Sequence, residues 1–253
     1  MKFFFGIAAL VLSLHTTDCF IFRRQPKLKD GVHVLIVGKS GKPSDPSASR
    51  SFEGTVAFVK QGDLKVIFDT GNYVQKWAMD RALRKFRIRP ADVDVVVTSH
   101  DHLDHVANVN FFTNRKTVVY HGASRIRGPD FKFKAAFEEG GVTLGEGVRM
   151  ILTPGHAGGK TDKSLIVESA ANLGGGKVAL VGDLFINAKS IKTKASRRRR
   201  SAGLSQTQRS RQWVIVCQEK VDFIVPGHAD IFEVTDAIRS QYNCEQEPQK
   251  PSN

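Results

Sequence analysis

The sequence predicts a layered α/β domain, because short β-branched runs alternate with segments of helical periodicity along most of its length. Runs such as residues 93–98 and 178–181 have the composition and length of buried strands. A leader of about 20 residues leaves roughly 230 for the folded part, which is enough for one domain with a sizeable core. Helices must then cover the sheets, since a sheet is stable only when its apolar face is buried.

In the first half, two turn signals separate the expected elements. The short turn at 61–63 joins two apolar runs and predicts a hairpin. Pro90 ends a segment of near-helical apolar spacing before the next strand. The first half is therefore expected to contain strands at 32–37, 55–59, 65–69 and 93–98 and helices at 73–86 and 103–112.

The second half repeats this rhythm of strands followed by covering helices. Its strands are expected at 118–120, 148–152, 164–167, 178–181 and 223–225, and its helices at 207–220 and 229–242. Periodicity alone supports a layered α/β domain and does not select a particular topology.

A dense cluster of histidines and aspartates follows the expected strand at 93–98. Its members are His100, Asp101, His102, Asp104 and His105. Imidazole and carboxylate are both good zinc ligands, and a catalytic metal site keeps one coordination position open for water or substrate. The cluster lies at a strand-to-helix turn, which is a common place for sites in layered α/β folds. It therefore predicts a metal centre.

Three further candidate ligands, His156, Asp183 and His228, each follow an apolar run that ends in a turn. Taken singly, a Pro-Gly-His sequence is usually a turn and a Gly-Asp sequence is usually a cap. Together with the first cluster, these residues supply enough ligands for two metal ions.

The order His-x-His-x-Asp-His, then His, Asp and His, resembles the metallo-β-lactamase superfamily. The resemblance covers nearly all of the chain after about residue 30 and implies an αββα sandwich of two mixed sheets flanked by helices. It assigns His100, His102 and His156 to the first metal, Asp104, His105 and His228 to the second, and Asp183 to both. It implies two zinc ions, and iron or manganese can also occupy such sites.

The same resemblance implies a mechanism in which a metal-bridging hydroxide attacks the substrate. Asp104 is expected to orient that hydroxide and to accept a proton, and no dedicated acid for the leaving group is evident. Asp69 is either a supporting carboxylate for a ligand imidazole or a turn residue. Lys160, Lys163 and His121 could contact substrate, although each is more often a solvated surface residue.

Several substrate classes remain open. The motifs at 153–159, 162–167 and 182–185 resemble a compact animal group of the superfamily, described as zinc endoribonucleases that act on histone pre-mRNA 3′ ends. The alternative is a glyoxalase-II-like thioester or ester hydrolase, although only 25 residues follow His228 where those enzymes carry a helical extension. A third alternative is a non-enzymatic metal- or polyanion-binding protein. The large RNA-processing architecture is excluded, because the chain has no room for its additional domain.

The N-terminus predicts entry into the secretory pathway. Residues 1–19 have the basic start and the twelve-residue apolar core, 3–14, of a signal peptide. The domain would then span 20–253, in the extracellular space or the ER lumen. An uncleaved anchor is the alternative, and the related group would place the protein in cytoplasm and nucleus.

The net charge of +13 comes mostly from a basic insertion at 187–206, expected to be mobile. Arg197, Arg198, Arg199 and Arg200 form its centre. The insertion is either a solvated loop, an arm that binds a polyanion, or a cleavage site for furin-like convertases. Whether Cys217 and Cys244 form a disulfide is open, and the related group suggests a homodimer.

Overall fold

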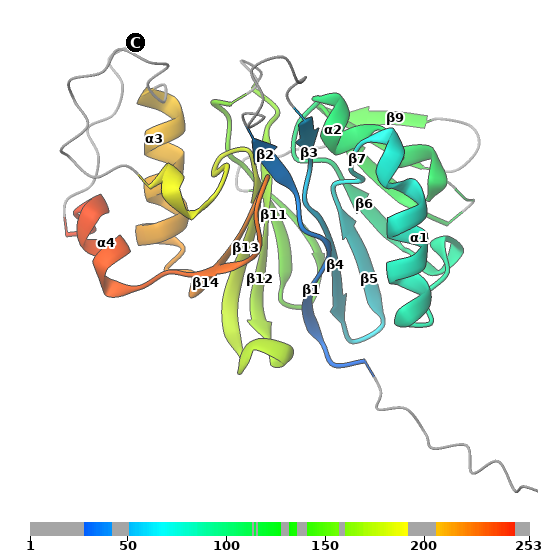
Figure 1. Cartoon of the computed structure of the whole chain (residues 1–253), viewed down its shortest axis with the longest axis horizontal. Coiled ribbons are helices and arrows are strands. Elements are labelled where there is room, and N and C mark those ends of the chain that lie inside the picture. Colours follow the sequence, from blue (N-terminus) through cyan, green and yellow to red (C-terminus); the bar gives the residue numbers. More distant parts are fainter. Residues whose placement is uncertain are drawn as a thin grey trace, which may run out of the picture.

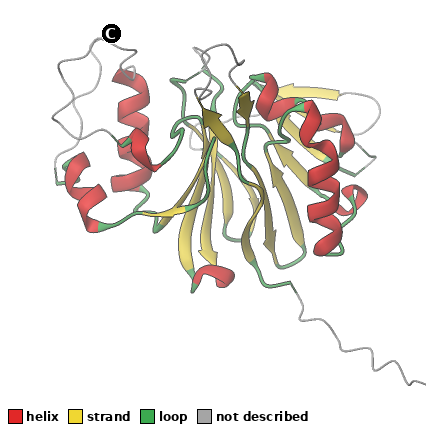
Figure 2. Ribbon diagram, viewed as in Figure 1, coloured by secondary structure: helices red, strands yellow, loops and turns green. Residues whose placement is uncertain are grey.

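Two mixed β-sheets lie face to face at the centre of the protein, and helices cover their outer sides (Figures 1 and 2). The structure is a computed structural model that describes residues 28–41, 51–112, 114, 116–127, 132–135, 141–156, 160–191 and 206–245. The α/β class and the two mixed sheets flanked by helices agree with the fold that the resemblance implied.

The first sheet has seven strands in the order β1-β4-β5-β6-β7-β8-β9. They are β1 (Gly31–Ile36), β4 (Val56–Gln61), β5 (Leu64–Phe68), β6 (Val95–Val97), β7 (Val118–His121), β8 (Ser124–Arg127) and β9 (Lys132–Ala135). β4 and β5 form the predicted hairpin, whereas β5, β6 and β7 run parallel. A separate ribbon of β2 (Lys39–Gly41) and β3 (Ser51–Glu53) lies above this sheet in Figure 1.

The second sheet has six strands in sequence order. They are β10 (Val142–Gly145), β11 (Val148–Leu152), β12 (Lys163–Ala170), β13 (Gly176–Gly182), β14 (Phe223–Pro226) and β15 (Phe232–Glu233). Neighbours are antiparallel except β13 and β14, which run parallel.

The helices are α1 (Lys76–Lys85), α2 (Leu103–Val106), α3 (Gln206–Trp213) and α4 (Asp236–Tyr242), and a π-helical turn (Val214–Gln218) continues α3. Short 3-10 turns are η1 (Tyr73–Gln75), η2 (Pro90–Asp92), η3 (Val109–Phe111), η4 (Ala171–Leu173) and η5 (Ala188–Ser190). The outer helices lie on opposite sides of the sandwich, with α1 over the first sheet and α3 and α4 over the second (Figure 1).

Two predicted helices are shorter than the sequence suggested. The segment 103–112 breaks at Asn108, whose side-chain amide donates to the carbonyl oxygens of Thr70 at 2.8 Å and Asn72 at 2.6 Å. The prediction for 229–242 is wrong in its first part, because β15 occupies 232–233. The helix begins only after Thr235, whose hydroxyl caps the next turn.

Alternation along the strands builds three apolar layers. In β4, Val59 faces the second sheet, whereas Phe58 packs with Met79 on the α1 side. In β12, Ile166 faces outward and packs with Ile215 of the π-helical turn. This inward and outward alternation is the period-two pattern of strands that are covered on both faces.

A disulfide joins Cys217 in the π-helical turn to Cys244, just beyond α4, with 5.0 Å between their Cα atoms. The sequence left this pairing open. The bond fixes the C-terminal helix against the helical layer of the second sheet. No helix in the described ranges is long and apolar enough to cross a membrane.

The predicted signal peptide at 1–19 and the arginines at 197–200 lie outside the described residues. Of the predicted insertion at 187–206, residues 192–205 lie outside them as well, and Ala188–Ser190 form η5. These predictions, and the domain limits that depend on them, stay predictions.

Candidate metal centre

The carboxyl ends of five strands meet at one edge of the sandwich. The turns after them carry Asp69 (β5), the His100 to His105 cluster (β6), His156 (β11), Asp183 (β13) and His228 (β14). The alternation of parallel and antiparallel neighbours makes β11, β13 and β14 point the same way, as β5 and β6 do. Polar side chains that are far apart in sequence are therefore brought to one place.

The seven predicted ligands fall into two groups. His100, His102, His156 and Asp183 form one, and Asp104, His105 and His228 form the other. Within each group, one potential ligand atom per residue lies within 4.8 Å of all the others. The first group reaches the surface through the exposed His102, whereas His105 and His228 in the second are buried.

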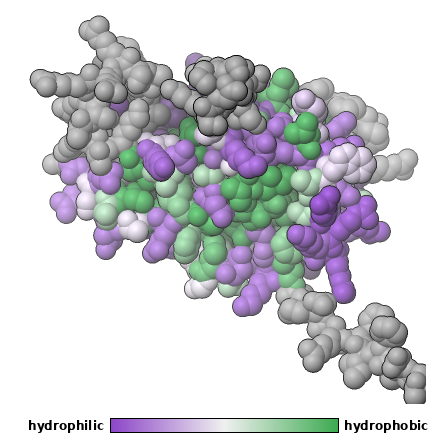
Figure 3. All heavy atoms as spheres, in the orientation of Figure 1, coloured by the Kyte–Doolittle hydropathy of each residue, from purple (hydrophilic) through white to green (hydrophobic). Residues whose placement is uncertain are grey.

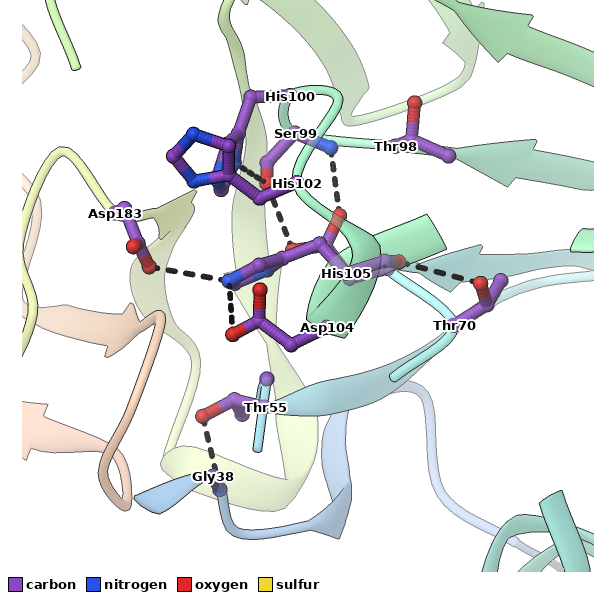
Figure 4. A network of polar contacts seen from close by, with 12 residues as sticks. Gly38, Thr55, Thr70, Thr98, Ser99, His100, His102, Asp104, His105 and Asp183 are labelled. Atoms are coloured by element: carbon purple, nitrogen blue, oxygen red, sulfur yellow. Dashed lines mark hydrogen bonds and ion pairs between the residues drawn. The ribbon is translucent and has the colours of Figure 1, made fainter. Parts of the chain in front are cut away.

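Asp183, a member of the first group, also contacts the second. Its Oδ1 is 3.2 Å from Nε2 of both His105 and His228, and its Oδ2 is 3.2 Å from Nε2 of His156. His105 also lies between Asp183 and Asp104, as Figure 4 shows. One carboxylate therefore faces nitrogens of both groups at once.

Neighbouring oxygens orient the imidazoles of His105 and His228. Nδ1 of His228 lies 3.0 Å from the carbonyl oxygen of Glu53, and Nδ1 of His105 lies 2.8 Å from Oδ2 of Asp69. Carbonyl and carboxylate oxygens only accept hydrogen bonds, so both Nδ1 atoms must donate. In the neutral ring the lone pair is then on Nε2, which faces the centre, as metal-binding histidines require.

Asp69 also holds the chain that carries His100. It accepts hydrogen bonds from Ser99 N at 2.6 Å and from Ser99 Oγ at 2.8 Å, and Ser99 Oγ lies 2.9 Å from Nδ1 of His100. Asn72 rather than Asp69 caps the following 3-10 turn. Of the two interpretations of Asp69, these contacts favour the supporting carboxylate.

The arrangement fits metal ions. Among the described residues, His100 Nε2 and Asp183 Oδ1 are buried side-chain atoms without a hydrogen-bond partner, because the short contacts of Oδ1 fall outside hydrogen-bond geometry. His156 Nε2 also lies only 3.3 Å from His102 Nδ1. Buried polar atoms without partners are costly, and a metal ion would satisfy them all. Imidazole nitrogens with carboxylates are a donor set that suits zinc.

The pKa values of the groups in the centre are shifted in opposite directions. Burial, with the nearby His105, lowers the pKa of His100 to about 2. Burial alone would also lower that of His105, but the carboxylates of Asp69 and Asp183 outweigh it and raise this pKa to about 10. For Asp183, burial is likewise outweighed by the close contacts of its carboxylate with His105, His156 and His228, so its pKa lies far below the usual range. The centre thus holds an anionic carboxylate among histidines.

Two glycines permit this close packing. A Cβ atom on Gly227 would lie 1.9 Å from Asp183 Oδ1, and one on Gly182 would lie 2.4 Å from Ser99 Oγ. Gly182 also has a φ of 50°, which glycine adopts without cost. From the sequence, these glycines were only turn signals. The sequence evidence for a packing role was that they immediately precede His228 and Asp183.

Lys163 departs from the expectation of a solvated lysine, since it is only 1% exposed. Its backbone N donates to Ser99 O at 2.9 Å, and its Nζ donates to Thr98 O at 3.0 Å. Burial lowers its pKa to about 8 despite nearby aspartates. Lys163 therefore holds the turn before His100, a role that its place at the start of the apolar run 164–167 could have suggested.

The other two candidate contacts lie nearer the surface. Lys160 is exposed as expected, and His121 is half-buried with Nδ1 3.0 Å from Thr98 Oγ1. Asp162 accepts hydrogen bonds from the backbone N atoms of Gly155 and His156 at 3.2 and 3.0 Å. Asp162 thus shapes the His156 turn, a function that the sequence did not reveal.

Residues 51–228 match the family model of the metallo-beta-lactamase superfamily. The chain is 31% identical to metallo-beta-lactamase domain-containing protein 1 of Rattus norvegicus over 83% of this chain and 81% of the relative. It is 30% identical to the Homo sapiens protein of that name over 81% of this chain and 74% of the relative.

Two solved structures share the fold. A metallo-beta-lactamase-like protein from Thermotoga maritima superposes with a TM-score of 0.54 at 17% identity, covering 81% of this chain and 100% of that one. A B3 metallo-beta-lactamase with an active-site glutamic acid gives 0.53 at 12% identity, covering 86% and 85%. With the family model spanning most of the described residues, the chain belongs to the metallo-β-lactamase superfamily.

Proposed function

We propose that the protein is a binuclear zinc-dependent hydrolase. The observation that carries the proposal is the Asp183 carboxylate, whose oxygens face nitrogens of both histidine groups at 3.2 Å. His100, His102 and His156 would hold the first ion, Asp104, His105 and His228 the second, and Asp183 both. The family supports a metal-dependent hydrolase, and the nitrogen-rich donor set favours zinc among the possible metals.

Bound zinc ions would lower the pKa of a water molecule and offset the negative charge that develops on the substrate. The protein's own part is to place the reactants. The carboxylate of Asp104 is partly exposed, and its Oδ2 lies 3.5 Å from Nε2 of both His105 and His228. It can therefore accept a proton from the attacking water at the mouth of the site. Substrate approaches beside His102, the exposed histidine of the centre.

For the substrate, we propose an RNA phosphodiester or an ester or thioester. The resemblance to compact animal endoribonucleases supports RNA. The disulfide between Cys217 and Cys244 supports the alternative, because disulfides persist in oxidising compartments where a secreted enzyme would not meet pre-mRNA. The same bond supports our proposal that the chain enters the secretory pathway through residues 1–19. A polyanion-binding protein without activity is the outcome that remains if no substrate is cleaved.

Metal analysis of the purified protein tests the central proposal. We expect about two zinc equivalents in the wild type, a large loss of both in Asp183→Ala, and no loss in Asp63→Ala, which removes an exposed carboxylate from the β4–β5 turn. Structured RNA, a glutathione thioester and a chromogenic cephalosporin, assayed side by side, separate the substrates. Wild-type turnover that survives exhaustive chelation would overturn the hydrolase mechanism.

Expression in cultured animal cells tests the secretory route. The full chain should reach the medium, and a variant with Leu10→Arg and Leu12→Arg, which interrupts the apolar core of the leader, should remain in the cells. If cleavage occurs at the four arginines, Arg200→Ala should convert two fragments into one intact chain. An intact wild-type band that Arg200→Ala leaves unchanged would contradict cleavage.

A further inference from the structure

Two glutamines of α3 are buried against the turn that follows β13. Gln208 and Gln212 are 6% and 1% exposed, and they are the only fully buried side chains of α3 among those whose exposure is described. They stand four positions apart and therefore share one face of the helix. The buried face of a helix is usually apolar, because burying an amide is costly unless its hydrogen bonds are kept. These two amides are therefore expected to have specific partners.

Both amides bond to the backbone directly after β13. Gln212 Nε2 donates to Leu184 O at 2.7 Å. Gln208 Nε2 donates to Asp183 O at 3.3 Å and to Leu184 O at 3.4 Å. A carbonyl oxygen only accepts, so the nitrogen of Gln212 faces Leu184 and its amide oxygen is left for Tyr242, whose Oη donates to it at 3.1 Å. Burial raises the pKa of Tyr242 above its usual value, which keeps this donor protonated.

Tyr242 reaches Gln212 from α4. Ser240 and Gln241 on this helix are exposed, and Figure 3 shows hydrophilic atoms at the surface where α4 lies in Figure 1. Tyr242 is half-buried instead, and its ring lies near edge-on to that of Phe185, with 6.4 Å between the centroids. The hydroxyl that orients the Gln212 amide is therefore itself held by packing outside the metal centre.

The backbone that the glutamines hold also joins two turns of the metal centre. Phe185 O and Ile186 O accept hydrogen bonds from Gly227 N and His228 N, both at 2.9 Å. Four successive carbonyl groups, 183 to 186, are thus fixed, the first two by α3 and the last two by the turn that carries His228. A shift of residues 183–186 would therefore displace candidate ligands of both groups.

α3 also packs against the turn that carries His156. A Cβ atom on Gly155 would lie 2.7 Å from Gln208 N and 2.8 Å from Gln208 Cα, so this turn lies directly against the helix backbone. His156 follows at once, and its Nε2 is 3.2 Å from Asp183 Oδ2. None of the seven candidate ligands lies on α3, yet the helix contacts the backbone around His156 and Asp183.

We propose that Gln212, oriented by Tyr242, is a positioning residue that holds the Asp183 carboxylate where it can serve both metal ions. The inference rests on the proposed function, because Asp183 is the shared ligand of the proposed binuclear centre. An amide that only satisfied a buried carbonyl would stabilise the fold and leave metal binding unchanged. Here the carbonyls belong to the shared ligand and to the residue after it, so their position also sets that of the carboxylate.

Gln212→Met tests the proposal, because Met has a similar length but no amide. Gln218→Met, the same substitution at an exposed position of the π-helical turn, is the matched control. Zinc affinity is measured against a competing chelator, and circular dichroism checks that each variant is folded. We expect the affinity of Gln212→Met to fall by about tenfold or more. That of Gln218→Met should equal the wild type.

Cobalt substitution separates positioning from a general loss of stability. The visible absorption of bound Co²⁺ depends on its ligands and their geometry. At full cobalt loading, the spectrum of Gln212→Met should differ from that of the wild type, whereas that of Gln218→Met should match it. A fall in affinity with a wild-type spectrum would mean that Gln212 only stabilises the fold, and would overturn the proposal.

Tyr242→Phe is a milder variant that removes one oxygen atom, and it decides the question if Gln212→Met does not fold. We expect its zinc affinity to fall by about threefold to tenfold. The double variant should bind zinc no more weakly than Gln212→Met alone, because both residues act through one chain of hydrogen bonds. Wild-type affinity in Tyr242→Phe, or additive losses in the double variant, would contradict the proposed chain from Tyr242 to Asp183.

Metal binding and turnover distinguish this inference from the proposed function. Equal zinc affinities and equal cobalt spectra for wild type and Gln212→Met would overturn the role of Gln212 and leave the hydrolase intact. The expected differences in Gln212→Met, without hydrolysis of RNA, thioester or cephalosporin by the wild type, would overturn the proposed function and leave Gln212 as a positioning residue of a metal-binding protein.

Discussion

The carboxylate of Asp69 lies 2.8 Å from Nδ1 of His105, although 36 residues separate them in the chain. The same carboxylate accepts two hydrogen bonds from Ser99, so one buried residue orients a candidate ligand of the second group and the turn that carries His100. Asp69 adopts a positive φ of 58°, which a non-glycine residue seldom does. The backbone strain at this position therefore accompanies a contact within the candidate metal centre.

Asp69→Asn should weaken metal binding without unfolding the protein. The amide keeps the size of the carboxylate but loses its charge, so it holds the His105 imidazole less firmly in the required tautomer. We expect zinc affinity of the second group to fall by about tenfold to a hundredfold. Zinc titration against a competing chelator measures this change.

Asp94→Asn is a suitable control, because Asp94 also accepts a backbone hydrogen bond, from Lys65 N, but lies at the far end of β6. It should leave zinc affinity unchanged. Equal affinities for wild type and Asp69→Asn would show that the His105 contact has no role in metal binding.

Local signals were sufficient to predict much of the fold and the candidate ligands. The hairpin β4–β5 and the strand β11 appear where apolar runs and turn residues placed them. The prediction was poorer wherever long-range contacts decide the structure. The helix 103–112 ends early because Asn108 bonds to backbone oxygens after β5, and nothing in the segment itself announces those partners.

The same limit applies to the supporting residues of the site. Lys163 is polar by residue type, and only the approach of the two sheets places its Nζ against Thr98 O. The partner of Cys217 was likewise undecided, because a buried thiol and a disulfide look alike in an apolar helix. Clustered ligands can be found from spacing, whereas the contacts that orient them depend on tertiary structure.

Gly227→Ala should disturb the metal centre through packing alone. The added Cβ would meet Asp183 Oδ1 at 1.9 Å and Gly182 C at 2.9 Å, so the carboxylate or the β14 turn must move. We expect a loss of about 1–3 kcal/mol in unfolding free energy and zinc affinity weakened by about tenfold or more. Urea unfolding and chelator competition measure the two effects.

Gly41→Ala is the matched substitution, since its Cβ would have no atom of the described residues within 4 Å and its φ is not positive. It should leave both quantities nearly unchanged. If Gly227→Ala binds zinc as tightly as Gly41→Ala does, the Gly227 contact does not fix Asp183.

The stability of the metal-free protein should fall as the solution becomes alkaline. The folded-state pKa of His105, at about 10, lies above its unfolded value of about 6.5. Its charged form therefore stabilises the metal-free fold fully below pH 6.5, and this contribution is lost as the pH rises through 10. Zinc would take the place of that proton, so the zinc-loaded protein should not show the same loss.

Urea midpoints of chelated and zinc-loaded protein between pH 6.5 and 10 test this difference. Lys163 has a lowered pKa and contributes with the opposite sign, but it does so in both forms and largely cancels in the comparison. Adding zinc to metal-free protein at pH 8 should also release protons into a weakly buffered solution. Parallel stability curves, or zinc binding without proton release, would contradict a protonated His105.

Removing the disulfide should destabilise the C-terminal helical layer more than the metal centre. Cys217 and Cys244 are 27 positions apart, and closing a loop of that length contributes about 3–4 kcal/mol through the unfolded chain. The double variant Cys217→Ala and Cys244→Ala should lose about this amount in urea unfolding. Dithiothreitol should lower the stability of the wild type similarly and leave the double variant unaffected.

Zinc content should stay near two equivalents in both proteins, because no candidate ligand lies on the π-helical turn or α4. A wild type whose stability is insensitive to reduction would show that the two thiols are not joined in solution, and would remove the structural support for a secretory route.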